Sequence, residues 1–142
     1  MNKQQAFTYT SPYIVFVDDD EEDREMVLET FERLNYHNIQ VLPDADQLLD
    51  QLGKLSAEQY PSLIVLDSNL PRLGGETTLM VIKKDPKFHT IPVMVMSSLM
   101  HSQKRETLLT LGACRAEEKP ATLTAYTQLM QELVTQVQAS KG

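Results

Sequence analysis

The most informative part of the chain is the stretch Leu63-Ile64-Val65-Leu66-Asp67-Ser68-Asn69-Leu70-Pro71. Its first four residues are all apolar, which is typical of a strand that is buried on both faces of a sheet. The apolar run ends at Asp67, and the small polar residues and the proline that follow are turn signals. We therefore expect Asp67 just past the carboxyl end of a central strand, the edge at which open α/β sheets bind ligands. A lone aspartate in that place more often only stabilises a turn, so its meaning depends on its neighbours.

The composition limits the classes of protein that come into question. A chain of 142 residues is long enough for one domain with a real core and too short for two comfortable ones. Its net charge of −7 argues against nucleic acid as a direct partner, because phosphate backbones are held by clustered Lys and Arg. The single cysteine, Cys114, excludes an internal disulfide and favours a reducing compartment. Neither a signal peptide nor an apolar run of about 20 residues is present, so we expect a cytoplasmic protein without a membrane partner.

Strand and helix patterns alternate along the whole chain. Apolar runs predict strands over residues 13–17, 39–42, 63–66, 91–96 and, more weakly, 114–118. Amphipathic patterns predict helices over about 21–34, 45–52, 74–84 and 102–111, and a last helix that starts at Pro120 and runs nearly to the end. Such alternation indicates an α/β fold with a parallel sheet and helices on both faces. We expect residues 1–11 to be a flexible extension and residues 12–142 to form the domain.

Right-handed crossovers bring the carboxyl ends of all the strands to one edge of the sheet. That edge should collect Asp18 and Asp19, Asp67, Ser97 and Lys119. Each of them has a plain structural explanation: Ser97 could cap a helix, and Lys119 could be a solvated surface lysine. As a set they point to chemistry, because three converging carboxylates repel one another unless a cation lies among them. Oxygen ligands of this kind suit Mg²⁺.

The same set contains the groups that phosphoryl transfer needs. Lys119 supplies a point charge for phosphoryl oxygens, and Ser97 supplies a hydroxyl donor. Asp67 lies between them, where its carboxylate could attack in line and form a covalent aspartyl phosphate.

The sequence resembles the receiver domain of bacterial two-component response regulators, in the stand-alone form typified by the chemotaxis regulator. The resemblance covers roughly residues 13–139. It rests on four motifs in the family's order and spacing: Val17-Asp18-Asp19, Leu66-Asp67-Ser68-Asn69-Leu70-Pro71-Arg72-Leu73-Gly74-Gly75, Val95-Met96-Ser97-Ser98 and Lys119-Pro120. The resemblance implies a flavodoxin-like (βα)5 fold with strand order 2-1-3-4-5.

The resemblance also implies a role for each site residue. Asp67 would accept a phosphoryl group from the phosphohistidine of a sensor kinase or a phosphotransfer protein. Asp18, Asp19, Asp67 and the backbone carbonyl of Asn69 would hold Mg²⁺. Ser97 would contact the phosphoryl group and reorient on activation, and Lys119 would pair with a phosphoryl oxygen. The protein would be a phosphoacceptor in signal transduction that acts on its own aspartate, rather than an enzyme with a separate substrate.

Two departures from the family pattern concern how the signal is transmitted. The family usually has Tyr or Phe three residues before the lysine as a rotamer switch, and this chain has Ala116 there. Glu117 and Glu118 occupy positions that are usually apolar, which a strand at the edge of a sheet tolerates. We therefore expect phosphorylation to be read out through the loop after Ser97 or through Arg115 and the two glutamates.

No output domain follows the last predicted helix, so we expect the protein to act by binding an unidentified downstream protein or by passing the phosphoryl group on. A homodimer through the fourth and fifth helices is possible. An alternative reading is a degenerate receiver that serves as a phosphorylation-independent adaptor. Two other classes fit less well: a phosphatase of the haloacid dehalogenase type would have a second Asp where this chain has Asn69, and a flavodoxin-like electron carrier would lack the acidic first loop.

Overall fold

The computed structural model of the protein describes residues 11–141. Strand and helix alternate along the described chain as the sequence predicts. The elements are β1 (Ile14–Val17), α1 (Glu21–Arg33), β2 (Ile39–Leu42), α2 (Ala45–Gly53), η1 (Ala57–Gln59), β3 (Leu63–Asp67), α3 (Gly74–Lys84), β4 (Val93–Ser97), α4 (Ser102–Thr110), β5 (Arg115–Glu118) and α5 (Leu123–Lys141).

The five strands form one sheet in the order β2-β1-β3-β4-β5, and every neighbouring pair is parallel. This confirms the predicted fold class and strand order. All residues of the three inner strands are buried, as expected for strands covered on both faces. The outer strand β5 is only partly buried and carries charged residues, which discourage pairing with another sheet edge. Within residues 11–141, no helix is both long and apolar enough to cross a membrane.

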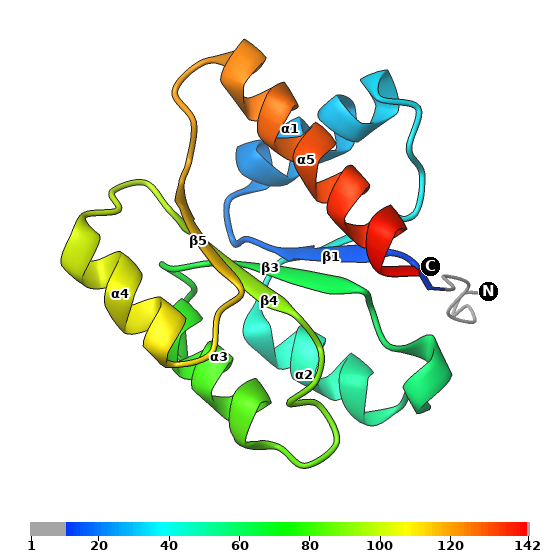
Figure 1. The fold of residues 1–142 in the computed structure, drawn as a ribbon, viewed down its shortest axis with the longest axis vertical. Helices are drawn as coiled ribbons and strands as arrows, with labels where there is room; N and C mark the ends of the chain where they lie inside the picture. The colour runs from blue at the N-terminus through cyan, green and yellow to red at the C-terminus, as the bar shows by residue number, and fades with distance from the viewer. Residues whose placement is uncertain (1–10, 142) are drawn as a thin grey trace.

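The helices cover the sheet on both sides, with α1 and α5 on one face and α2, α3 and α4 on the other (Figure 1). Each face has its own apolar core, because successive residues of a strand point to opposite faces. On the α1 and α5 side, the apolar stripe predicted for the last helix is buried against the sheet. Its members are Tyr126, Leu129, Met130, Leu133, Val134 and Val137.

The acidic residues that follow β1 form the start of α1, as predicted. Asp20 is the N-cap, and its carboxylate accepts a hydrogen bond from the backbone N–H of Glu22 at 3.2 Å. Three acidic residues then occupy the first helical turn, where negative charge complements the helix dipole. This turn places one acidic side chain, Asp23, beside the carboxyl edge of the sheet.

The structure differs from the sequence prediction by two or more residues at the starts of two elements. Strand β4 begins at Val93 rather than at residue 91, because Pro92 has no backbone N–H to give to a neighbouring strand. Helix α5 begins at Leu123 rather than at Pro120, and Thr122 caps it by accepting a hydrogen bond from the N–H of Ala125 at 3.1 Å. The three-residue helix η1 has no counterpart in the prediction.

The predicted N-terminal extension, residues 1–11, lies outside the described residues except for its last member. Ser11 donates a hydrogen bond from its hydroxyl to the backbone carbonyl of Tyr60 at 2.8 Å.

Candidate functional site

Strand register places the predicted site residues at one edge of the sheet. Val17 of β1 is paired with Leu66 of β3, so Asp18 and Asp67, one step further along each strand, lie side by side. Asp67 is in turn paired with Met96 of β4, directly before Ser97. Ser97 is paired with Glu118 of β5, and its carbonyl accepts a hydrogen bond from the N–H of Lys119 at 2.8 Å. Backbone pairing alone therefore brings four elements together at this edge.

Three carboxylates meet at this edge. Asp18, Asp19 and Asp67 each offer one oxygen, and these oxygens lie within 4.8 Å of one another. Asp18 and Asp67 are buried, whereas Asp19 is exposed. The turn after each strand orients its aspartate: the N–H of Asp20 donates to Asp18 Oδ1 at 3.0 Å, and the N–H of Asn69 donates to Asp67 Oδ1 at 3.3 Å.

Lys119 provides the positive charge that balances these acids. Its Nζ atom lies 3.1 Å from Asp18 Oδ2, 2.9 Å from Asp23 Oδ2 and 3.6 Å from Asp67 Oδ1. Desolvation lowers the pKa of Lys119, but the hydrogen bond with Asp23 and the charges of Asp18 and Asp67 raise it more, so the net pKa lies above its usual value. The lysine is therefore permanently charged.

Asp18 keeps a proton more readily than an ordinary aspartate. Burial raises the pKa of Asp18 from 3.8 to about 6, and the negative charge of Asp67 adds to the rise. The N–H of Asp20 and the ammonium group of Lys119 counteract part of it. The raised pKa of Asp18 therefore reflects mainly the removal of this carboxylate from water.

The acidic edge fits a small divalent cation. Its donors are hard carboxylate oxygens, which are the ligands that Mg²⁺ and Mn²⁺ prefer. The excess of negative charge would be relieved by such an ion, and the exposure of Asp19 leaves room for the water ligands that Mg²⁺ retains.

Ser97 lies on the other side of Asp67, at the end of β4, and is buried. Its hydroxyl oxygen accepts a hydrogen bond from Lys104 Nζ at 2.8 Å. The same Nζ atom lies 3.4 Å from the hydroxyl oxygen of Ser68, the residue directly after Asp67. A second lysine therefore reaches the edge from the first turn of α4.

Gly75 allows α3 to begin close against the carboxyl end of β3. A Cβ atom on this residue would lie 2.7 Å from the Cα atom of Ser68 and would also overlap the carbonyl oxygen of Asp67. Its N–H donates to the carbonyl of Ser68 at 3.1 Å. A side chain at position 75 would therefore push the turn that carries Asp67 out of place.

A cleft opens next to the acidic edge, between the sheet, α1 and α5. Its polar wall consists of the carboxylates of Asp18, Asp23 and Asp67 with Lys119, and its apolar wall includes Met26 of α1. The site is thus open toward the α1 and α5 side of the molecule.

The structure brings together the side chains of Asp18, Asp19, Asp67 and Lys119, as the sequence predicts, and Ser97 ends the neighbouring strand β4 with its hydroxyl bound to Lys104. Asn69 lies in the same turn and contacts Asp67 through its N–H. Sequence reasoning missed two residues, Asp23 and Lys104. A signal was available for both, because each lies four residues before a residue on the buried face of its helix, Val27 for Asp23 and Leu108 for Lys104.

Around β5, polar contacts surround Ala116, which is itself buried. Arg105 of α4 donates from Nε to the Ala116 carbonyl at 2.9 Å, and Glu118 accepts a hydrogen bond from the N–H of Met100 at 3.0 Å. Arg115 pairs with Glu117 at 3.2 Å and with Glu132 of α5 at 3.0 Å. The loop after Ser97 and the first turns of α4 are thus connected to β5 by side-chain hydrogen bonds.

The family model for response regulator receiver domains matches residues 14–132, which is most of the chain. The chain belongs to this family. Two-component response regulator ORR8 of Oryza sativa subsp. indica is 34% identical to this receiver over 89 residues, which are 63% of this chain and 70% of ORR8. Response regulator Rcp1 of Synechocystis sp. is also 34% identical over 89 residues, covering 60% of each chain.

Solved structures show the same fold. The phosphorylated cyanobacterial phytochrome response regulator RcpA matches this receiver with a TM-score of 0.77 at 23% identity, over 92% of this chain and 96% of RcpA. The Mn²⁺-bound form of Rcp1 matches with a TM-score of 0.72 at 24% identity, over 86% of this chain and 91% of that one. As a response regulator receiver, the protein functions in two-component signalling.

Proposed function

We propose that this receiver takes a phosphoryl group onto Asp67 in a reaction that depends on Mg²⁺, and that the modification changes its affinity for a partner protein. The observation that carries the proposal is the position of Asp67. It is buried at the sheet edge, with two further carboxylates within 4.8 Å, Lys119 Nζ at 3.6 Å and the Ser97 hydroxyl on the neighbouring strand. The donor would be the phosphohistidine of a sensor kinase or of a phosphotransfer protein.

The transfer is a displacement at phosphorus. An oxygen of the Asp67 carboxylate attacks the phosphorus atom, the new O–P bond forms, and the P–N bond to the histidine of the donor breaks. The electron pair of that bond stays with the leaving imidazole nitrogen. Lys119 stabilises negative charge on the transferring group, and the Ser97 hydroxyl donates a hydrogen bond to one of its oxygens.

Asp18, Asp19 and Asp67, with the Asn69 carbonyl, would hold the Mg²⁺ ion, which neutralises charge on the phosphoryl oxygens when bound. Two related proteins support this reading: the structure of Rcp1 holds Mn²⁺, and that of RcpA is of the phosphorylated protein. Asp23 lies 2.9 Å from Lys119 Nζ, closer than Asp67 at 3.6 Å, and would position its ammonium group.

We infer a cytoplasmic location, because the donor kinases transfer phosphoryl groups inside the cell. The downstream partner would recognise the face that carries α4 and β5, since the loop after Ser97 is hydrogen-bonded to β5 through Met100 and to α4 through Leu99. Because Ala116 stands in place of an aromatic switch, the readout would rely on the polar contacts of Arg105 and Glu118 with the neighbouring backbone.

The intact mass of the protein, measured after incubation with Mg²⁺ and acetyl phosphate, tests the proposal. We expect a single phosphoryl adduct that is absent in Asp67→Asn and absent when a chelator replaces Mg²⁺. Glu106→Gln, on the exposed side of α4, serves as a matched control that should be modified as fully as the natural chain. A folded protein that takes no adduct would contradict the proposal and favour the adaptor that works without phosphorylation.

A further inference from the structure

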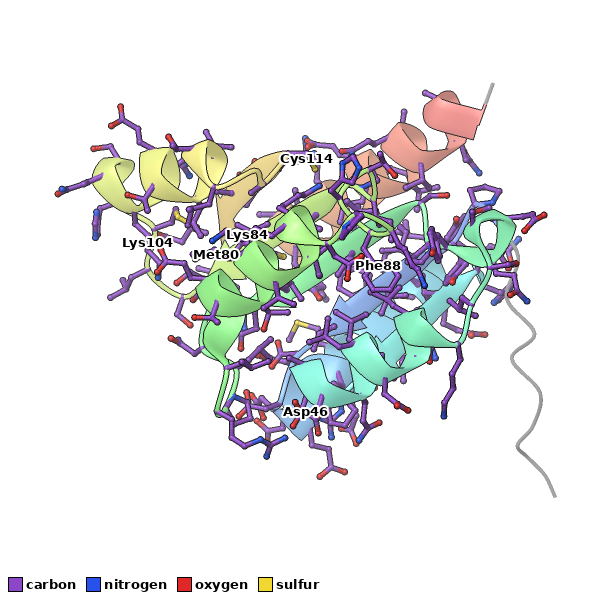
Figure 2. All side chains as sticks on the ribbon, turned by 90° about the horizontal axis from the view of Figure 1, so that it is seen from below. Asp46, Met80, Lys84, Phe88, Lys104 and Cys114 are labelled. Atoms are coloured by element: carbon purple, nitrogen blue, oxygen red, sulfur yellow. The ribbon has the colours of Figure 1, made fainter. Side chains whose placement is uncertain are left out.

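The start of α4 is connected to the site by one side chain, that of Lys104. Its ammonium nitrogen lies 2.8 Å from Ser97 Oγ, 3.4 Å from Ser68 Oγ and 3.5 Å from the carbonyl oxygen of Leu99. The side chain is half-buried and runs from the helix toward the end of β4 (Figure 2). Both hydroxyls belong to residues that adjoin the phosphoacceptor, one in sequence and one on the neighbouring strand.

The charge of Lys104 has no anionic partner in this state. Within the part of the chain that the structure describes, no carboxylate oxygen lies within 4.0 Å of its nitrogen, and its three contacts are neutral oxygens. Lys119 differs, because its charge is already shared among three carboxylates. A cation that is partly withdrawn from water and held by hydroxyl groups is well suited to bind an anion that arrives beside them.

The donor and acceptor chemistry of the contact is also specific. An ammonium group can only donate hydrogen bonds, so Ser97 Oγ must act as the acceptor toward Lys104. The contact with Lys104 leaves the hydrogen of the Ser97 hydroxyl unused. That hydrogen can be donated to an oxygen of the phosphoryl group. Lys104 therefore keeps Ser97 in the role of a donor at the site.

We propose that Lys104 is a second lysine that binds the phosphoryl group on Asp67 and thereby draws the first turn of α4 toward the phosphorylated edge. This inference rests on the proposed phosphorylation of Asp67. If Ser97 donates to a phosphoryl oxygen, Lys104 Nζ starts within about 5.5 Å of that oxygen, which is two hydrogen-bond lengths. The phosphoryl group brings up to about two negative charges, and Lys104 is a nearby cation that no carboxylate of the described residues holds within 4.0 Å.

The packing of α4 makes the helix responsive to such a pull. Within α4, all of whose residues are described, Leu108 alone is buried, so the helix has little apolar contact to hold it in place. Its other attachments near the site are polar, such as the contact of Arg105 with the Ala116 carbonyl. A new ionic contact at Lys104 would shift the balance of these attachments without an aromatic switch at position 116.

The test uses the full chain with beryllofluoride, a mimic of the phosphoryl group, in the presence of Mg²⁺. Binding and amide shifts are followed by NMR in the natural chain, Lys104→Gln, Lys104→Arg and the control Lys84→Gln, which removes an exposed lysine from the last turn of α3 (Figure 2). We expect Lys104→Gln to weaken binding by about tenfold, the usual effect of losing one hydrogen bond to a charged group. Lys104→Arg should restore most of the affinity, and Lys84→Gln should not change it.

The same spectra report on α4. In the natural chain the amide resonances of residues 102–105 should shift on binding, and in Lys104→Gln the shifts should be largely lost while the unfolding midpoint of the free protein is unchanged. If Lys104→Gln binds beryllofluoride as tightly as the natural chain and shows the same shifts, the inference is wrong and the proposed function stands. If the natural chain itself binds no beryllofluoride, both the inference and the proposed function are contradicted.

Discussion

An alanine at position 75 would place its Cβ atom 2.7 Å from the Cα atom of Ser68, inside the turn that carries Asp67. Because the overlap is with backbone rather than with the end of a flexible side chain, the turn must move. We expect Gly75→Ala to lower the free energy of unfolding by about 1–3 kcal/mol, as overpacked sites do. It should also reduce the phosphoryl adduct that forms with acetyl phosphate.

Gly53→Ala is the matched control for this substitution. A Cβ atom at Gly53 meets nothing within 4 Å, and this residue ends α2. We expect the substitution to be neutral or to stabilise the protein by up to about 1 kcal/mol, with full phosphorylation. Urea unfolding and intact mass measure the two effects, and equal losses in both variants would refute the close approach of α3 to Asp67.

The site residues that were hardest to predict from the sequence are those that reach the site from within a helix. Asp18, Asp19, Asp67, Ser97 and Lys119 could be placed together because each ends a strand or lies within two residues of its carboxyl end, so topology determines their position. Asp23 and Lys104 lie within helices, where the helix rotation and the side-chain rotamer decide what they reach. The ordinary explanation for Asp23, complementing a helix dipole, also holds in the structure and concealed its contact with Lys119.

At the scale of elements, α4 is the least firmly attached helix that bears on the site. Leu108 is 1% exposed and belongs to the core, whereas the neighbouring Leu109 is 43% exposed. We expect Leu108→Ala to cost about 2–4 kcal/mol and Leu109→Ala less than about 1 kcal/mol. Hydrogen exchange of amides 105–110 should accelerate in Leu108→Ala more than exchange in the inner strands. Similar exchange in both variants would show that α4 has another anchor.

Element boundaries show where sequence patterns stop being informative. The apolar run that begins at Ile91 predicted a longer β4. Ile91 is buried, as an apolar residue should be, but it precedes the strand, which begins at Val93. Pro120 is a favourable first helical residue. In the structure it lines the cleft beside Asp67 instead, and α5 starts after the cap at Thr122. In both cases the sequence pattern indicated a residue next to the element, but it did not determine at which residue the regular backbone hydrogen bonds begin.

For the whole molecule, the alternation of strand and helix patterns was sufficient to predict a parallel sheet with helices on both faces, whereas the strand order was predicted from the resemblance to receiver domains. The acidic edge lowers the free energy of unfolding of the whole molecule. Three carboxylates at one end of the sheet oppose folding, and a bound cation would offset this by mass action. Function and stability are therefore expected to depend in opposite ways on the acids of the site.

The pH dependence of stability makes this opposition measurable. The pKa of Asp18 is about 6 in the folded protein against 3.8 without the fold, so between these values the folded state holds the proton more tightly. The stability that Asp18 contributes in a chelator is therefore fully present below about pH 4 and is lost as the pH rises to about 6. The limit of this loss is about 3 kcal/mol, and solvent screening should reduce it to about 1–2 kcal/mol.

Asp18→Asn removes the titrating carboxyl and should behave in the opposite way to a damaging mutation. In a chelator at neutral pH we expect it to be about 1–2 kcal/mol more stable than the natural chain, with a difference that vanishes near pH 4. Saturating Mg²⁺ should stabilise the natural chain and leave Asp18→Asn almost unchanged, since the variant lacks a ligand carboxylate. Urea unfolding from pH 4 to 7.5, with and without Mg²⁺, measures all three effects. A variant that is less stable than the natural chain in the chelator would show that Lys119 alone compensates the acidic edge.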